Sequence, residues 1–212
     1  MADLVTVADL ATAGGTLVLA IATFGATRSS NRAARIAERA LLVGLRPVLA
    51  PSQSSDPPVK VGFQDQHWLK VEPGRAAVED VNDVIYLALA LRNIGQGMGV
   101  LHGWHLIPER LIQVDEHADL GLFRRQGIDL YIPGGGTGYW EGALRDPEDP
   151  LAVAVRKVLA NDGENGLTLE LLYGDTDGGQ RTVTRFGLTA MGNGMWIPAV
   201  SRHWELDRPS PR

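Results

Sequence analysis

The stretch Leu10–Thr27, which reads LATAGGTLVLAIATFGAT, contains no charged residue. A helix of this length would extend about 27 Å, close to the ~30 Å hydrocarbon thickness of a bilayer. We therefore predict a transmembrane helix here, although alanine, glycine and threonine dilute its hydrophobicity. The alternative is a buried, alanine-rich helix of a soluble protein. The charges on the two sides of the stretch favour the membrane interpretation.

Those flanking charges differ in sign. Asp3 and Asp9 precede the stretch, and four arginines follow it: Arg28, Arg32, Arg35 and Arg39. Arginines near one end of a membrane helix favour the cytoplasmic side. The chain is therefore expected in the plasma (cell inner) membrane, with its N-terminus outside and its C-terminal domain in the cytoplasm. A cleaved signal peptide fits less well, because it carries its positive charge before the apolar run.

Residues 28–45 are predicted to continue the helix beyond the membrane. The four arginines are spaced four, three and four apart, so they share one helix face. We expect this face to contact lipid headgroups, the alternative being an ordinary solvated surface. Small residues four apart, Ala11 with Gly15 and Ala22 with Ala26, would also permit a homo-oligomer through this helix.

Composition restricts the function of the remaining chain. The 212 residues include no cysteine, which excludes disulfides, thiolate metal sites and cysteine nucleophiles. Residues 1–46 carry a net charge of +2, so the rest carries −7. An acidic body argues against nucleic-acid binding, which needs a basic surface.

Residues 46–206 read as a β-rich domain. The clearest strand is Asp83–Asn93, in which leucine and isoleucine alternate with other residues, and EDVND at 79–83 reads as a loop. Asp149-Pro150 predicts a helix start, with the aspartate as N-cap. Eight or nine short strands with one inserted helix fit an immunoglobulin-like β-sandwich best, and a small barrel is the alternative. The tail 207–212 is predicted to be flexible.

Three short motifs suggest a family. They are Arg46-Pro47-Val48-Leu49, Leu91-Arg92-Asn93-Ile94-Gly95-Gln96-Gly97 and Tyr173-Gly174-Asp175. With the apolar N-terminal helix and its basic extension, the chain resembles uncharacterised single-pass membrane proteins of actinobacteria and other bacteria, which carry an immunoglobulin-like domain. The resemblance covers most of the chain and implies the architecture. It implies no catalytic residue and no activity.

Candidate chemical motifs favour structural interpretations. His102 and His105 on a strand point to opposite faces, so one metal ion cannot take both, and His102 is expected in the core. The glycine run 134–138 leads into a strand rather than a helix, which favours a turn over a phosphate loop. DTDGG at 175–179 lacks the rest of a calcium loop. We expect no catalytic residue, no metal and no cofactor.

The aromatic residues offer the best candidate for ligand contact. Most of the five tryptophans are expected to pack the core. Tyr139 and Trp140 are adjacent on a predicted strand, so one of them should point outward and could bind a ligand. The leading hypothesis is a membrane-anchored, non-enzymatic module that binds a protein partner. A small-ligand or carbohydrate binder using exposed aromatics comes second, and a hydrolase using His102, His105 or His203 comes third.

Overall fold

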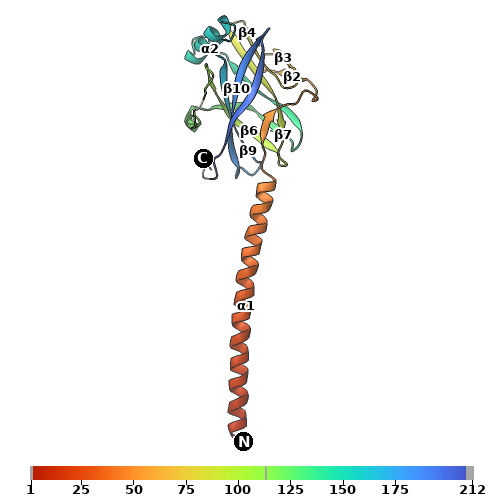
Figure 1. Ribbon diagram of the computed structural model, residues 1–212, viewed down its shortest axis with the longest axis vertical. Helices are drawn as coiled ribbons and strands as arrows, with labels where there is room; N and C mark the ends of the chain where they lie inside the picture. The colour runs from red at the N-terminus through yellow and green to blue at the C-terminus, as the bar shows by residue number, and fades with distance from the viewer. Residues whose placement is uncertain (1, 113, 209–212) are drawn as a thin grey trace. The chain divides into compact units, whose positions relative to one another are not determined.

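The computed structural model describes residues 2–112 and 114–208, with side chains from residue 14 onward. The chain divides into two compact units between Gly44 and Leu45. The first is the single helix α1 (Ala2–Gly44), and the second is mainly β (Figure 1). The helical extension predicted after residue 27 is confirmed, because α1 continues without a break to Gly44.

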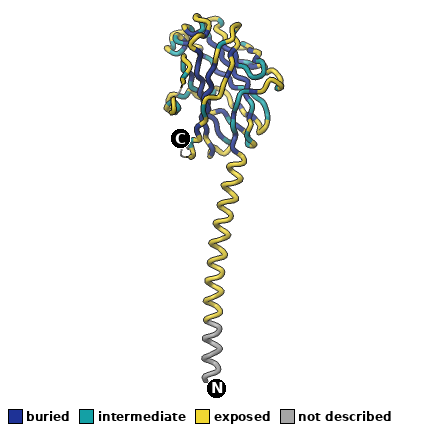
Figure 2. The backbone as a smooth tube through the Cα atoms, viewed as in Figure 1, coloured by how far each residue is buried: buried dark blue, intermediate teal, exposed yellow. Residues whose placement is uncertain are grey.

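Helix α1 is exposed along its described length (Figure 2). Within the part of the chain that the structure describes, no helix combines the length and the apolarity needed to cross a membrane. The prediction of a transmembrane helix over Leu10–Thr27 is therefore corrected: the helix is present, but its described part is not apolar enough to cross a membrane. Residues 14–27 give only 14 uncharged residues before Arg28, about 21 Å of helix, and residues 10–13 of the predicted segment lie outside the described side chains.

The β domain is built on a nine-stranded antiparallel sheet with the order β1-β5-β4-β11-β10-β9-β6-β7, and β8 pairs with the other edge of β5. Its strands are β1 (Leu49–Pro51), β4 (Ala76–Val81), β5 (Val84–Asn93), β6 (Gly99–Ile107), β7 (Arg124–Ile132), β8 (Thr137–Leu144), β9 (Leu167–Gly174), β10 (Arg181–Gly192) and β11 (Met195–Glu205). The remaining elements are the hairpin β2 (Val59–Gly62) and β3 (Trp68–Val71), the 3₁₀ turn η1 (Leu120–Leu122) and helix α2 (Pro150–Ala160).

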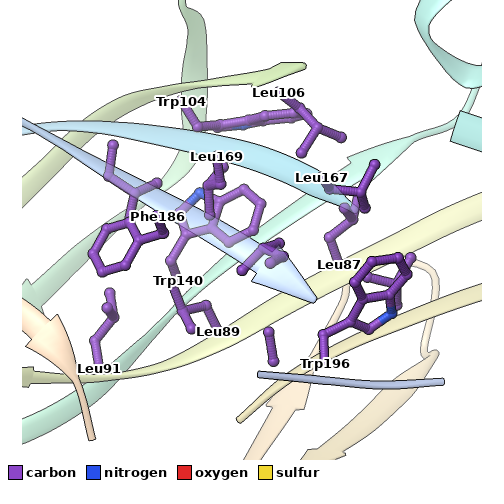
Figure 3. Packing of buried hydrophobic residues seen from close by; sticks show 14 of the residues in the cluster. Leu87, Leu89, Leu91, Trp104, Leu106, Trp140, Leu167, Leu169, Phe186 and Trp196 are labelled. Atoms are coloured by element: carbon purple, nitrogen blue, oxygen red, sulfur yellow. The ribbon is translucent and has the colours of Figure 1, made fainter. Parts of the chain in front are cut away.

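One hydrophobic core receives side chains from all nine strands of this sheet (Figure 3). Ile85, Leu87, Leu89 and Leu91 of β5 form one wall, as their alternation predicts, and Ala152, Val155 and Val158 of α2 join the same cluster. A single sheet can enclose one core only by curling around it. The fold is therefore a large curled antiparallel sheet with one inserted helix, and the described strands do not divide into the two facing sheets of the predicted sandwich.

The outer face of β5 is also buried. Tyr86, Ala88 and Ala90 pack in a second cluster with Val61, Phe63, Leu69 and Val71 of the β2–β3 hairpin. Because β5 is covered on both faces and paired along both edges, it is the central strand of the domain.

The side chain of Asn93, at the end of β5, hydrogen-bonds the backbone of the segment that precedes β1. Its Oδ1 accepts hydrogen bonds from Val48 N (3.1 Å) and Gly95 N (3.0 Å). Its Nδ2 donates to Gly97 O (2.7 Å) and Ile132 O (3.0 Å). A Cβ on Gly95 or Gly97 would collide with the backbone between Leu45 and Val48. The sequence motifs 46–49 and 91–97 therefore contact each other, and the glycines of the second motif let the two backbone segments approach closely.

Two local predictions are wrong. Residues 79–81 belong to β4 and not to a loop, because Asn82 and Asp83 both have positive φ and form a two-residue hairpin turn to β5. In β6 a register shift between Leu101 and Gly103 puts Leu101 in the core and leaves His102 exposed, where plain alternation had placed His102 inside.

Candidate functional site

The four arginines predicted to meet lipid lie on the exposed surface of α1. Arg28, Arg32, Arg35 and Arg39 are all exposed, and none forms an ion pair with another described residue. Just before them, large apolar side chains project from the same helix: Leu17, Val18, Leu19, Ile21 and Phe24 are 63–70 % exposed. The helix thus presents an apolar surface followed by a cationic one.

Tyr139 and Trp140 point to opposite sides of β8, as adjacent strand residues must. Tyr139 is half-buried and lies against the outer cluster under the β2–β3 hairpin. Trp140 is 1 % exposed and lies in the central core (Figure 3). Of the two predicted binding residues, only Tyr139 has a partly accessible ring, and the structure does not bring them together on one surface.

Trp140 packs tightly in that core. Its ring meets that of Trp104 edge-on, with centroids 5.4 Å apart. Gly142 makes room for both indoles, since a Cβ there would lie 2.6 Å from Trp140 and 3.1 Å from Trp104. Trp140 cannot stack on a ligand without leaving this arrangement.

The histidines named for hydrolysis lie in three different environments. His102 is exposed at the bulge of β6, His105 lies beside the Phe123 ring at 5.8 Å, and His203 Nδ1 is hydrogen-bonded to Thr184 Oγ1 at 2.6 Å. Burial lowers the pKa of His203, and the pKa of His102 is lowered by partial loss of solvent around its ring and by the charge of Arg181, although much of the residue is exposed. Among the described residues no group of three or more His, Cys, Asp or Glu side chains could hold a metal ion.

Both loops with a resemblance to ligand-binding motifs are turns between consecutive strands, and only the second joins two paired strands. Residues 133–136 join β7 to β8, and Gly136 N donates to Pro133 O at 2.9 Å. Asp175 begins the turn between β9 and β10, where its Oδ1 accepts from Gly179 N at 2.9 Å. The turn interpretation is confirmed for both.

The β domain has a pocket of about 290 Å³ between β7 and β8. Within the described residues, β7 ends the strand order beside β6 and β8 lies off that order beside β5, so the two strands are not paired with each other. One hydrogen bond crosses between them, from Gln126 Nε2 to Glu141 O at 3.0 Å. Phe63 and Gln64, at the end of β2, form another part of the wall.

The wall of this pocket contains two buried oxygens without a hydrogen-bond partner, Glu141 Oε2 and Gln126 Oε1. Glu141 is only 8 % exposed. Burial raises the pKa of its carboxyl; the charge of Arg145 opposes that shift and the charge of Asp65 adds to it. The carboxyl is thus poorly solvated and incompletely paired, which is unusual for a buried group.

Three arginines surround the pocket: Arg124, Arg125 and Arg145. Arg124 pairs with Asp149 at 2.6 Å and lies over the Trp104 ring, 5.6 Å from its centroid. Burial opposes ionisation of Asp149, but the hydrogen bonds from Arg124 and from Leu151 N hold its pKa below the usual value. Arg145 faces Asp65 at 3.4 Å.

Arg125 differs from the other two arginines. It is exposed, and no ion pair to it occurs among residues 14–112 and 114–208. The residues that line the pocket therefore include two with an unpaired acceptor and one arginine without an ion pair.

Sequence reasoning missed Glu141 and Gln126. Glu141 was detectable in principle, as a charged residue between Trp140 and Gly142 in the otherwise uncharged strand TGYWEGAL. Its link to Gln126 was not detectable, because the two strands meet through folding and not through a hairpin ladder. Comparison with known protein families, with curated proteins and with solved structures finds no match, so the family resemblance stays a prediction.

Proposed function

We propose that this chain is a membrane-anchored, non-enzymatic interaction module, in which α1 attaches the β domain to a lipid bilayer. The observation that carries the proposal is the exposed apolar surface of α1 between Leu17 and Phe24. Moving one such side chain out of water gains about 1.5–3 kcal/mol. Leu17, Val18 and Leu19 are consecutive and so point about 100° apart, which favours immersion of the helix over contact along one face.

Two threonines support a lipid environment for this segment. Thr23 Oγ1 donates to Leu19 O at 2.7 Å, and Thr27 Oγ1 donates to Thr23 O at 2.8 Å. Each hydroxyl proton is thereby satisfied within the helix, so neither side chain needs water as its acceptor. The segment carries its polar groups into an apolar medium at low cost.

The arginines define the orientation within this proposal. Arg28, Arg32, Arg35 and Arg39 follow the apolar segment, and each would gain up to about 1 kcal/mol near an anionic leaflet. The proposed orientation therefore has the β domain on the cytoplasmic side of the plasma membrane and the N-terminus outside. A crossing of full length draws on the uncharged residues from Leu10 onward.

The β domain is proposed to supply recognition of a partner protein. The scattered environments of His102, His105 and His203 support a role without catalysis. Crosslinking of the full-length protein in intact membranes, followed by mass spectrometry, tests this part. A specific crosslink from the β domain supports it, and crosslinks confined to α1–α1 pairs would replace it with self-association.

Membrane fractionation tests the anchor. The full-length chain should stay in the membrane pellet after alkaline carbonate extraction, and Leu17→Ser with Ile21→Ser should release most of it. The matched control is Ile112→Ser, an equally exposed apolar residue of the β domain. Carbonate release of the unmodified chain would indicate a peripheral helix, and recovery in the supernatant without any treatment would disprove anchoring.

The cysteine-free sequence permits a clean test of orientation. Single cysteines at Asp3→Cys and Ser54→Cys can be labelled with a membrane-impermeant maleimide in intact cells. The proposal expects labelling at position 3 and none at position 54 until the cells are lysed. The reverse pattern would invert the orientation, and no labelling difference would argue against a crossing.

A further inference from the structure

The pocket between β7 and β8 has a feature that packing alone does not explain. Glu141 Oε2 and Gln126 Oε1 lie on its two sides, each buried and each without a donor. A buried unsatisfied polar group destabilises a fold by about 1–3 kcal/mol. Two of them lining one cavity leave acceptor positions that a molecule entering it can fill.

The donors have to be N–H or O–H groups, because both unpaired atoms are acceptors when Glu141 is ionised. A primary ammonium group supplies three N–H donors and a positive charge that matches the carboxylate. A simple amine is nevertheless a poor ligand, since Arg124, Arg125 and Arg145 surround the same pocket and repel a lone cation.

Arg125, which has no ion pair among the described residues, could offset this repulsion if the ligand also carried a negative charge. Arg124 and Arg145 already face Asp149 and Asp65, so Arg125 is the cation that lacks a carboxylate. An anionic group on the same ligand would pair with it, and guanidinium binds carboxylate in a two-pronged geometry. A ligand that carries both charges therefore matches both halves of the pocket.

Other ligand classes fit less well. A metal ion would find one carboxylate among three arginines. A sugar ring needs an accessible aromatic face, whereas Trp104 and Phe63 are 4 % and 7 % exposed, and Arg124 covers Trp104. A pocket of about 290 Å³ is near the lower limit for small-molecule sites, which suits a compound of amino-acid size.

We propose that this pocket binds a small zwitterion of the amino-acid type, with its ammonium group on Glu141 and Gln126 and its carboxylate on Arg125. The site lies wholly within the β domain, so the proposal holds whether or not α1 is anchored in lipid. It assigns the unpaired oxygens a role in recognition.

The test is calorimetric titration of the full-length chain in a neutral detergent with unbranched ω-amino acids from glycine to 5-aminopentanoate. Butylamine and butanoate serve as matched ligands with a single charge. At least one amino acid should bind with a Kd below about 1 mM, and at least about tenfold more tightly than either single-charge ligand.

Two variants assign the contacts. Glu141→Gln removes the charge that meets the ammonium group and Arg125→Gln removes the partner of the carboxylate, and each should weaken binding at least about tenfold. Arg181→Gln, a substitution of an exposed arginine on β10 away from the pocket, should bind as the unmodified chain does. Arg125 is exposed, so its variant is expected to fold even if Glu141→Gln does not.

The possible results separate clearly. No binding by any member of the series overturns the proposal, and so does equal binding of butanoate, which would reveal a plain anion site. Binding that survives both pocket substitutions would place the ligand elsewhere. The proposal is supported if one chain length of the ω-amino acids binds best. This preference should be lost in Glu141→Gln and Arg125→Gln and kept in Arg181→Gln.

Discussion

Two glutamates in the β domain are buried in different ways. Glu170 lies on β9 between the core residues Leu169 and Leu171, and Glu141 follows the core residue Trp140 on β8, so both carboxyls point to the outer side of the curled sheet. Glu170 is 0 % exposed, and both of its oxygens are paired: Oε1 with Arg185 at 2.6–2.8 Å and Oε2 with Ala118 N at 2.9 Å. Glu141 is 8 % exposed, and its Oε2 has no partner.

The two glutamates differ because the segment between β6 and β7 covers Glu170 and its partner Arg185. Arg185 donates to the carbonyls of Val114 (2.7 Å) and Glu116 (2.5 Å), and its guanidinium lies 4.8 Å from the centre of the Trp204 ring. The segment between β6 and β7 thus seals the charge pair with backbone groups. No described segment does the same for Glu141. Both oxygens of Glu170 therefore have partners, whereas the buried Glu141 Oε2 has none among the described residues.

Removing one member of the sealed pair should give the largest effect. Arg185→Ala leaves Glu170 buried without its cation, and the free energy of unfolding should fall by about 3–5 kcal/mol. Guanidinium unfolding of the full-length chain can be followed by tryptophan fluorescence, because all five tryptophans lie in the β domain. A loss below about 1 kcal/mol would mean that the pair is less isolated from water than its burial indicates.

The control for that prediction removes both charges. The double variant Arg185→Met with Glu170→Leu should recover most of the loss, since a well-packed apolar pair can replace a buried ion pair. If the double variant is as unstable as Arg185→Ala, the carbonyl bonds from Arg185 to the loop are the main contribution.

A neutral buried group should give the next largest effect. Asn93 is fully buried and makes four hydrogen bonds that join β5, β7 and the segment before β1. Asn93→Ala should lower the unfolding free energy by about 2–4 kcal/mol, because it leaves several backbone groups unpaired. Asn93→Asp sets a carboxylate oxygen against the carbonyls of Gly97 and Ile132, so it should lower the unfolding free energy at least as much as Asn93→Ala. A loss under about 1 kcal/mol would contradict the assigned role.

Local patterns in the sequence predicted much of the fold. Alternation located β5, and Asp149-Pro150 marked the start of α2, where Asp149 Oδ1 accepts from Leu151 N at 2.9 Å. The Asn93 motif was visible as a motif, although its contact partner was not. Such features are encoded within a few residues, so they can be read without knowing the tertiary structure.

The features that failed depend on distant parts of the chain. Glu79 and Asp80 are tolerated in β4 because they point to exposed positions, and Asp80 pairs with Arg156 of α2 at 3.0 Å. The bulge at His102 has no counterpart in its own sequence pattern. Likewise the candidate pocket arises where β7 and β8 approach without pairing, which no local pattern of either strand indicates.

The smallest expected effect is the most direct check on Glu141. Burial raises the pKa of its carboxyl, so the folded chain binds this proton more tightly than the unfolded chain does. This contribution to stability is therefore present below the unfolded pKa, near 4.3, and is lost as the pH rises through the folded pKa. Glu141→Gln cannot titrate and should lack this loss.

The measurement is the difference in unfolding free energy between Glu141→Gln and the unmodified chain, taken at intervals from pH 4 to pH 8 without added ligand. The difference should grow in favour of the glutamine variant as the pH rises from 4 to 8. Groups with a lowered pKa, such as Asp149, titrate in both proteins and cancel in the difference. Parallel curves would show that Glu141 is solvated or paired in solution, and the contrast with Glu170 would then disappear. A difference that grows with pH and shrinks again when 4-aminobutanoate is added would tie the unpaired oxygen to the ligand, because an ammonium partner stabilises the ionised carboxylate.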